Sequence, residues 1–112
     1  MSSFRSITPS IPRITIAAAV GAALHVGQGD LNAVDQKAVE FSRVMLSHMA
    51  VDGEIICCEG PTDKAPAFAR REKVGKGVGP VVDFIVDPAD GTTAIAKGLK
   101  DAISALACAP RG

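Results

Sequence analysis

The chain has 112 residues, of which 47% are hydrophobic, and its 12 basic and 12 acidic residues leave it formally neutral. This length allows at most one domain, and the balanced charge argues against a nucleic-acid-binding surface or a polybasic membrane patch. The longest apolar stretch, residues 14–24, is too short to cross a bilayer.

Residues 1–12 are punctuated by Ser and Pro and have no repeating apolar face, so we expect a disordered tail before a domain at residues 13–112. No acidic residue precedes Asp30. An amino-terminal segment without acidic residues weakly resembles an organelle transit peptide. We favour a plain tail on a cytoplasmic protein. Residues 13–26 are Ala-rich and predict a helix that glycine ends.

Residues 31–50 form the most amphipathic segment, because apolar side chains recur at three- and four-residue steps. Asp35 lies off this apolar stripe. By pattern alone, Asn32 and Asp35 resemble a capping box, which would give Asp35 a structural role at the helix start. The predicted stripe consists of Leu31, Val34, Ala38, Phe41, Met45 and Met49.

Residues 53–59 predict a strand that ends in Glu59. A carboxylate buried there would need a partner, whereas an exposed Glu59 would simply begin a loop. Cys57 and Cys58 in this strand, and Cys108 in a later one, are expected to be buried reduced thiols.

Residues 62–80 are basic and glycine-rich, which favours a solvated loop over a phosphate clamp. A short strand is expected within this loop at residues 65–68. Beyond the loop, residues 93–99 predict a short helix, and residues 101–107 predict a further strand.

Residues 81–87 are rich in β-branched side chains and predict a strand. The side chains alternate between two faces, so residues 82, 84 and 86 face one side while Asp83 and Asp87 face the other. Asp87 therefore lies at the carboxyl end of the strand, where ligand sites form in α/β sheets.

Pro88 favours a turn after this strand, which would bring Asp87 and Asp90 close together. Two adjacent carboxylates repel each other unless a cation or a proton lies between them, and their oxygens are natural ligands of Mg²⁺ or Mn²⁺. With Gly91 and Thr92 beside them, this pattern indicates metal-assisted attack of water on a phosphate ester. An ordinary tight turn fits the same spacing.

The segment DPADGT at residues 87–92 resembles the D-P-x-D/E-G-T signature of the lithium-sensitive phosphomonoesterase superfamily. Three further segments narrow the resemblance to the class II fructose-1,6-bisphosphatase family, in order and spacing. They are GQGDLNAVDQKAV (27–39), CEGPTDKAP (58–66) and AKGLKDAISALA (96–107). The resemblance covers nearly the whole chain but only the amino-terminal third of the family's length.

This resemblance implies a layered α/β sugar-phosphatase fold, here a partial one with the opening helices and part of the first sheet. It implies hydrolysis of the 1-phosphate of fructose 1,6-bisphosphate with Mg²⁺ or Mn²⁺. By position, Asp35, Glu59, Asp87 and Asp90 match metal ligands. Asp35 and Thr92 match catalytic residues, and Asp90, Gly91 and Thr92 match contacts to the substrate phosphate.

Two alternatives remain open from the sequence. One is a phosphatase acting on another sugar bisphosphate or on inositol phosphates. The other is a non-catalytic remnant that packs on a partner. A partial chain of this kind is expected to have little or no turnover by itself, and assembly as a homo-oligomer is left open.

Overall fold

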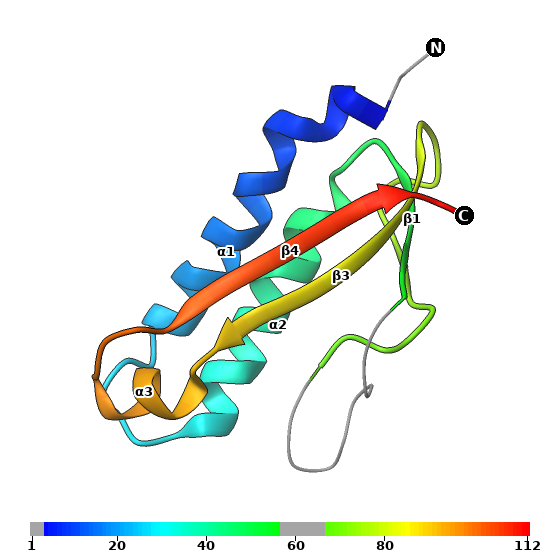
Figure 1. Cartoon of the computed structure of the whole chain (residues 1–112). Coiled ribbons are helices and arrows are strands. Elements are labelled where there is room, and N and C mark those ends of the chain that lie inside the picture. The colour runs from blue at the N-terminus through cyan, green and yellow to red at the C-terminus, as the bar shows by residue number, and fades with distance from the viewer. Residues whose placement is uncertain (1–3, 57–66) are drawn as a thin grey trace.

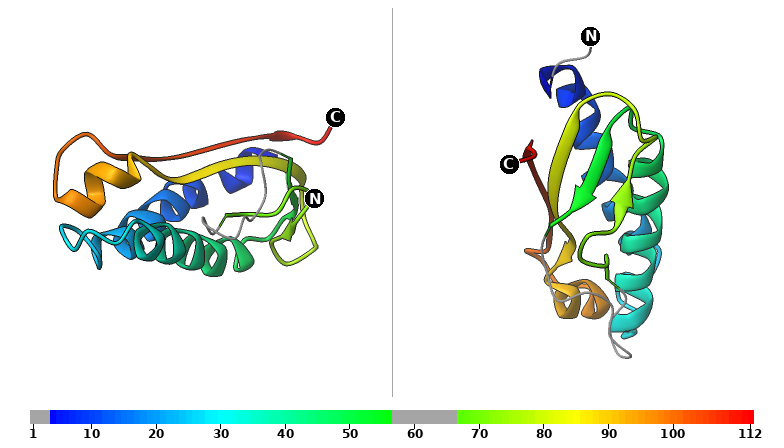
Figure 2. Two further views of the ribbon diagram at one scale, coloured as in Figure 1. Left: turned by 90° about the horizontal axis from the view of Figure 1, so that it is seen from below. Right: turned by 90° about the vertical axis from the view of Figure 1, so that its right-hand side faces the viewer.

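A computed structural model describes residues 4–56 and 67–112, which form a mixed α/β fold with helices on one face of a sheet (Figures 1 and 2). The strand order is β2-β1-β3-β4. β1 pairs antiparallel with β2 and parallel with β3, and β3 pairs antiparallel with β4. This confirms the expected partial α/β architecture. The elements are η1 (Phe4–Ser10), α1 (Ile11–Ala23), α2 (Leu31–Ser47), β1 (Asp52–Ile55), β2 (Lys73–Val74), β3 (Val81–Asp90), α3 (Thr92–Lys97) and β4 (Ile103–Pro110).

The amino-terminal segment is ordered from Phe4 onward, so the expected disorder of residues 1–12 is wrong for its described part. A 3₁₀ helix, η1, leads directly into α1, and Ile7 is buried in the core. Pro12 lies in the first turn of α1, where a missing N–H does no harm. Phe4 and Ile11 pack against the same core, but these few apolar residues do not form a periodic pattern in the sequence.

The start of α2 is capped by Asp30, whose carboxylate accepts a hydrogen bond from the Ala33 N–H at 3.0 Å. The alternative interpretation of Asn32 and Asp35 as a capping box is therefore wrong. Asp lies directly before the first turn, where its side chain reaches the free N–H groups. This leaves the Asp35 side chain available for contacts outside its own helix.

The buried face of α2 follows four-residue steps through Val34, Ala38, Ser42 and Leu46. Leu31, which the predicted stripe included, is 43% exposed. Ser42 is fully buried, and its hydroxyl donates to the Ala38 carbonyl oxygen at 2.7 Å. The polar side chain is thus satisfied within the helix, which lets a serine occupy a core position.

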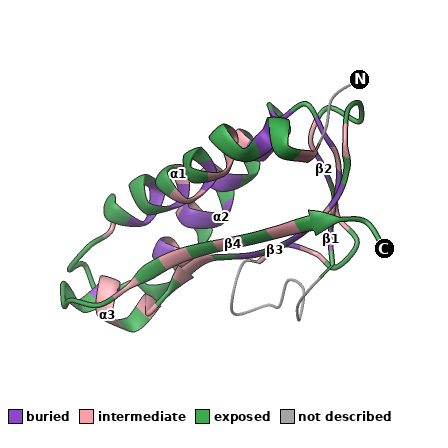
Figure 3. Cartoon of the chain, turned by 45° about the horizontal axis from the view of Figure 1, so that its top comes forward, coloured by how far each residue is buried: buried purple, intermediate pink, exposed green. Residues whose placement is uncertain are grey.

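The sheet is buried on one face only (Figure 3). On β3, Val82, Phe84 and Val86 are buried against the helices, whereas Val81 and Ile85 are 45% and 47% exposed. The predicted alternation is confirmed. Among the described residues, the outer face of β3 and β4 remains open and largely apolar.

β3 is longer than expected and continues through Pro88 to Asp90. The pairing with β4 shifts register between Asp87 and Asp90, as in a β-bulge. The predicted tight turn after Asp87 is therefore wrong. Proline cannot donate to a sheet ladder, and a bulge is a position that tolerates it.

Other boundaries differ by a few residues. The loop at 62–80 contains the short strand β2. A strand is expected at residues 65–68, but residues 67 and 68, the described part of it, are not in a strand. Cys108 is a free, half-buried thiol in β4 whose pKa is raised by burial. Cys57, Cys58 and Glu59 lie outside the described residues.

No helix in residues 4–56 or 67–112 has the length and apolar character to cross a membrane.

Candidate active site

Three elements meet at one end of the molecule: the start of α2, the end of β3 and α3 (Figure 1). The loop between α1 and α2 is bonded to α3, because the Gly27 N–H donates to the Ile95 carbonyl at 2.9 Å and the Gly29 N–H to the Ala96 carbonyl at 2.7 Å. Ala96 is fully buried among small side chains of α1 and α2. This packing brings Asp35 next to the segment that resembles the phosphatase signature.

The contact that joins them is a hydrogen bond from the Thr92 hydroxyl to Asp35 Oδ1 at 2.8 Å. The same hydroxyl also lies 3.2 Å from the Ala89 carbonyl oxygen. Thr92 has one proton to donate, so these two acceptors share it. The amino-terminal part of α2 and the first turn of α3 are thereby held together through side chains 57 residues apart in sequence.

The pKa of Asp35 is raised above its usual range because the carboxylate is partly buried. The hydrogen bond from Thr92 favours the charged form and offsets part of this effect. The fold thus keeps a partly desolvated carboxylate beside a hydroxyl, with no basic partner for it among the described residues.

The pKa of Asp87 is also raised, first by burial and then by the negative charges of Asp90 and Asp35. Asp90 and Asp35 therefore both lie near enough to Asp87 for their charges to disfavour its ionised form. Like charges gathered in this way are typical of sites that hold a cation or a proton. The turn pattern predicted that Asp87 lies near Asp90, the family resemblance added Asp35, and the fold brings both near Asp87.

Gly91 connects β3 to α3 with a left-handed backbone at φ +92°. A Cβ at this position would lie 3.2 Å from Ala102 Cα, so the β3–α3 junction has little room for a side chain. Glycine adopts this conformation without strain and therefore allows the abrupt change of direction that points Thr92 toward Asp35.

The donor type of this site fits a hard divalent cation, because Asp35, Asp87 and Asp90 supply only carboxylate oxygens. Within the described residues, no three Asp, Glu, His or Cys side chains are gathered closely enough to hold a metal ion by themselves. Glu59, the fourth expected ligand, is outside the described part of the chain. The site as described is therefore an acidic cluster with the right chemistry rather than a complete coordination shell.

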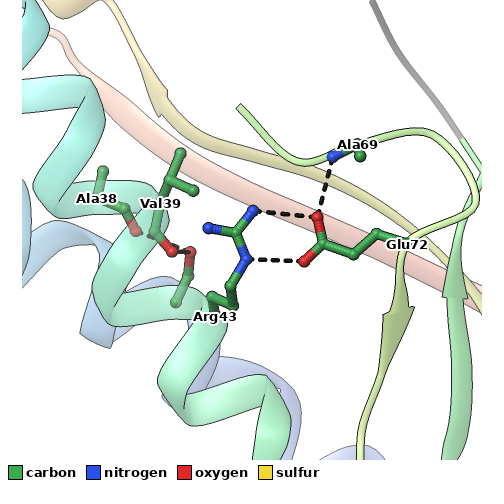
Figure 4. Close-up of polar contacts among 6 residues, drawn as sticks. Ala38, Val39, Arg43, Ala69 and Glu72 are labelled. Atoms are coloured by element: carbon green, nitrogen blue, oxygen red, sulfur yellow. Dashed lines mark hydrogen bonds and ion pairs between the residues drawn. The ribbon is translucent and has the colours of Figure 1, made fainter. Parts of the chain in front are cut away.

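Sequence reasoning missed an anchor between α2 and the loop before β2 (Figure 4). Arg43 makes two hydrogen bonds to Glu72, at 2.7 and 3.0 Å, and its guanidinium lies 4.7 Å from the centre of the Phe68 ring. The Ala69 N–H donates to the same carboxylate at 3.0 Å.

Burial by itself would raise the pKa of Glu72, but the hydrogen bonds from Arg43 and Ala69 and the Arg43 charge outweigh burial and lower it. No motif links residues 43 and 72, and nothing in the sequence alone pairs them. The anchor fixes residues 69–72 against the helix that carries Asp35.

The sequence matches the family model described as bacterial fructose-1,6-bisphosphatase, glpX-encoded, over residues 5–112. The chain belongs to this fructose-1,6-bisphosphatase family. It is 45% identical over 103 residues to the class 2 fructose-1,6-bisphosphatase of Haemophilus influenzae, and 39% identical over 108 residues to fructose-1,6-bisphosphatase 1 class 2 of Escherichia coli K12.

These matches cover 92% and 96% of this chain but only 31% and 32% of the two relatives. The chain therefore spans about a third of the length of these curated class 2 relatives. Membership in the family confirms the resemblance drawn from the four sequence segments, including its partial extent.

Proposed function

We propose that this chain supplies part of the active site of a class 2 fructose-1,6-bisphosphatase, which hydrolyses the 1-phosphate of fructose 1,6-bisphosphate. The observation that carries the proposal is the hydrogen bond between Thr92 and Asp35. It joins the start of α2 to the D-P-A-D-G-T segment and places a hydroxyl beside Asp35, whose negative charge, like that of Asp90, acts on Asp87.

Asp35, Asp87 and Asp90, together with Glu59, would hold Mg²⁺ or Mn²⁺. When bound, such a cation would lower the pKa of water and offset the charge on a transferring phosphoryl group. Residues Asp90 to Thr92 would contact the substrate phosphate.

Thr92 has a distinct role in this scheme. Its proton is shared between Asp35 Oδ1 and the Ala89 carbonyl oxygen, which leaves the lone pairs of Oγ1 free to accept a hydrogen bond from an attacking water. Asp35 would keep the hydroxyl in this orientation, so that Thr92 positions the water and does not itself attack.

A chain with a third of its relatives' length is expected to have little turnover alone, because a substrate needs contacts around its whole surface. Its location in the cytoplasm and its assembly as a homo-oligomer stay predictions. Action on another sugar bisphosphate or on an inositol phosphate is the alternative within the same chemistry.

The test is a thermal melt with and without Mn²⁺, on the chain and on Asp87→Asn. Binding to the folded state alone stabilises it by about 2.7 kcal/mol at a hundredfold excess of ion over the dissociation constant. We expect a rise in Tm that Asp87→Asn abolishes. Asp83→Asn is the matched control, because Asp83 lies on the same face of β3 and should leave the Mn²⁺ response intact.

A melt that is indifferent to Mn²⁺, or a response that Asp87→Asn retains, would overturn the assignment of the metal ligands. A phosphate-release assay on fructose 1,6-bisphosphate accompanies the melt. Full turnover by the 112-residue chain would contradict the expectation that it is only part of an active site.

A further inference from the structure

A pocket of about 230 Å³ lies on the outer face of the sheet, away from the acidic cluster. Three of its six lining residues are arginines. Asp83 also lines the pocket. Its side chain points to the same face of β3 as that of Asp87, which lies four residues, or about 13 Å, further along the strand. The lining consists of Glu54, Ile56, Arg70, Arg71, Asp83 and Arg111.

The two acids of this pocket are already paired. Arg111 lies 3.1 Å from Asp83 and 3.5 Å from Glu54, and Lys73 lies 3.2 Å from Glu54. These contacts hold the Arg111 guanidinium in place and neutralise both carboxylates. With Lys73 included, four cations face two anions, so the pocket has a net positive charge.

Neither the Arg70 nor the Arg71 side chain has an ion pair or hydrogen bond in the described structure. Both are exposed at the pocket edge, so their guanidinium donors are free. An arginine fork matches the oxygens of a phosphate group in geometry and in charge.

Arg71 is held in an unusual backbone conformation, with φ +68°. Its N–H donates to the Ile55 carbonyl at 2.6 Å, and the Ile55 N–H donates to the Glu72 carbonyl at 2.9 Å. Arg43 fixes Glu72 from the other side. A non-glycine residue kept in the left-handed region between two such anchors is the kind of outlier that marks functional positions.

We propose that Arg70, Arg71 and Arg111 form a binding pocket for a dianionic phosphate group, separate from the proposed active site. The ligand is either free phosphate or the phosphate of a small monoester. Ile56 supplies an apolar wall that a monoester's carbon chain can contact.

The experiment is an NMR titration of the whole chain with inorganic phosphate at pH 8, at constant ionic strength and without divalent cations. A parallel titration with glycerol 3-phosphate distinguishes a free ion from a monoester by which binds more tightly. We expect saturable shifts of the backbone amides of Ile56, Arg70 and Arg71, while those of Gly91 and Thr92 stay unchanged.

Arg71→Gly is the informative variant, because glycine accepts the same φ and only the guanidinium is lost. It should weaken phosphate binding about tenfold, as expected for one charge-assisted contact. Arg70→Gln should act in the same direction. Arg13→Gln on α1 removes a remote charge and should leave the affinity within about twofold, since salt screens distant charges.

Equal affinity in Arg71→Gly, Arg70→Gln and Arg13→Gln would overturn the proposal, as would shifts confined to residues 87–92. Because no divalent cation is present, this result is independent of the Mn²⁺ melt. A chain whose Tm does not respond to Mn²⁺ can still bind phosphate at this pocket, and a chain that does not bind phosphate here can still respond to Mn²⁺.

Discussion

Asp87 is a carboxylate whose charged form the fold disfavours. Burial and the charges of Asp90 and Asp35 raise its pKa above the usual 3.8. A raised acid pKa means that the folded protein holds the proton more tightly than the unfolded chain does. The charge on Asp87 therefore destabilises the fold. This destabilisation has its full size at pH values above the folded-state pKa, and it disappears as the pH falls below the pKa of Asp87 in the unfolded chain.

Asp87→Asn should therefore raise the free energy of unfolding at pH 7 in metal-free buffer, and the gain should vanish below about pH 3.8. Urea denaturation at several pH values measures this. Asp83→Asn should instead lower the free energy of unfolding at pH 7, because it removes an ion pair with Arg111 at 3.1 Å. A loss of stability in metal-free Asp87→Asn would show that the carboxylate is not repelled by its neighbours.

At the scale of elements, α1 and α2 pack closely because Gly21 presents no side chain to α2. A Cβ at Gly21 would collide with the backbone carbonyl of Lys37 and lie 3.0 Å from the Phe41 ring. The close approach of these helices sets where the α1–α2 loop meets α3. The position of Asp35 relative to Thr92 depends on this packing.

Gly21→Ala should destabilise the fold by about 1–3 kcal/mol, even though alanine is the better helix former, because the added methyl meets backbone atoms that cannot rotate away. Chemical denaturation gives the value. Val20→Ala on the neighbouring position, which is 51% exposed, should change stability by no more than about 0.5 kcal/mol. A neutral Gly21→Ala would mean that the two helices lie further apart.

At the scale of the whole molecule, the sheet has a covered face and an open face. Phe84 is completely buried between β3 and the helices, while its neighbour Ile85 is 47% exposed on the outer face. Exposed apolar faces of this kind are typical of interaction surfaces. The same outer face also contains the pocket lined by Arg70, Arg71 and Arg111.

Phe84→Ala should lower the stability by about 3–5 kcal/mol, whereas Ile85→Ala should cost at most about 1 kcal/mol, because only the first leaves a cavity in a closed core. Both are measured by denaturation at low protein concentration. If Ile85→Ala cost as much as Phe84→Ala and the loss did not depend on concentration, the outer face would be covered within a single chain.

The sequence by itself determined the local features of this protein. Alternation along β3 predicted that residues 82, 84 and 86 face the core, and four motif segments identified the family and three of the acids that the fold brings together. These features follow from side-chain period and from spacing within one segment, which do not depend on distant contacts.

Tertiary structure alone decided the remaining features. Whether Asp35 caps its own helix or bonds to Thr92 depends on how α3 docks, and Asp30 takes the capping role instead. Residues 87–90 continue the strand because β4 pairs with them through a bulge. In both cases a local preference is worth only about 1 kcal/mol. Contacts with residues far away in the chain, together with burial of the shared core, outweigh it.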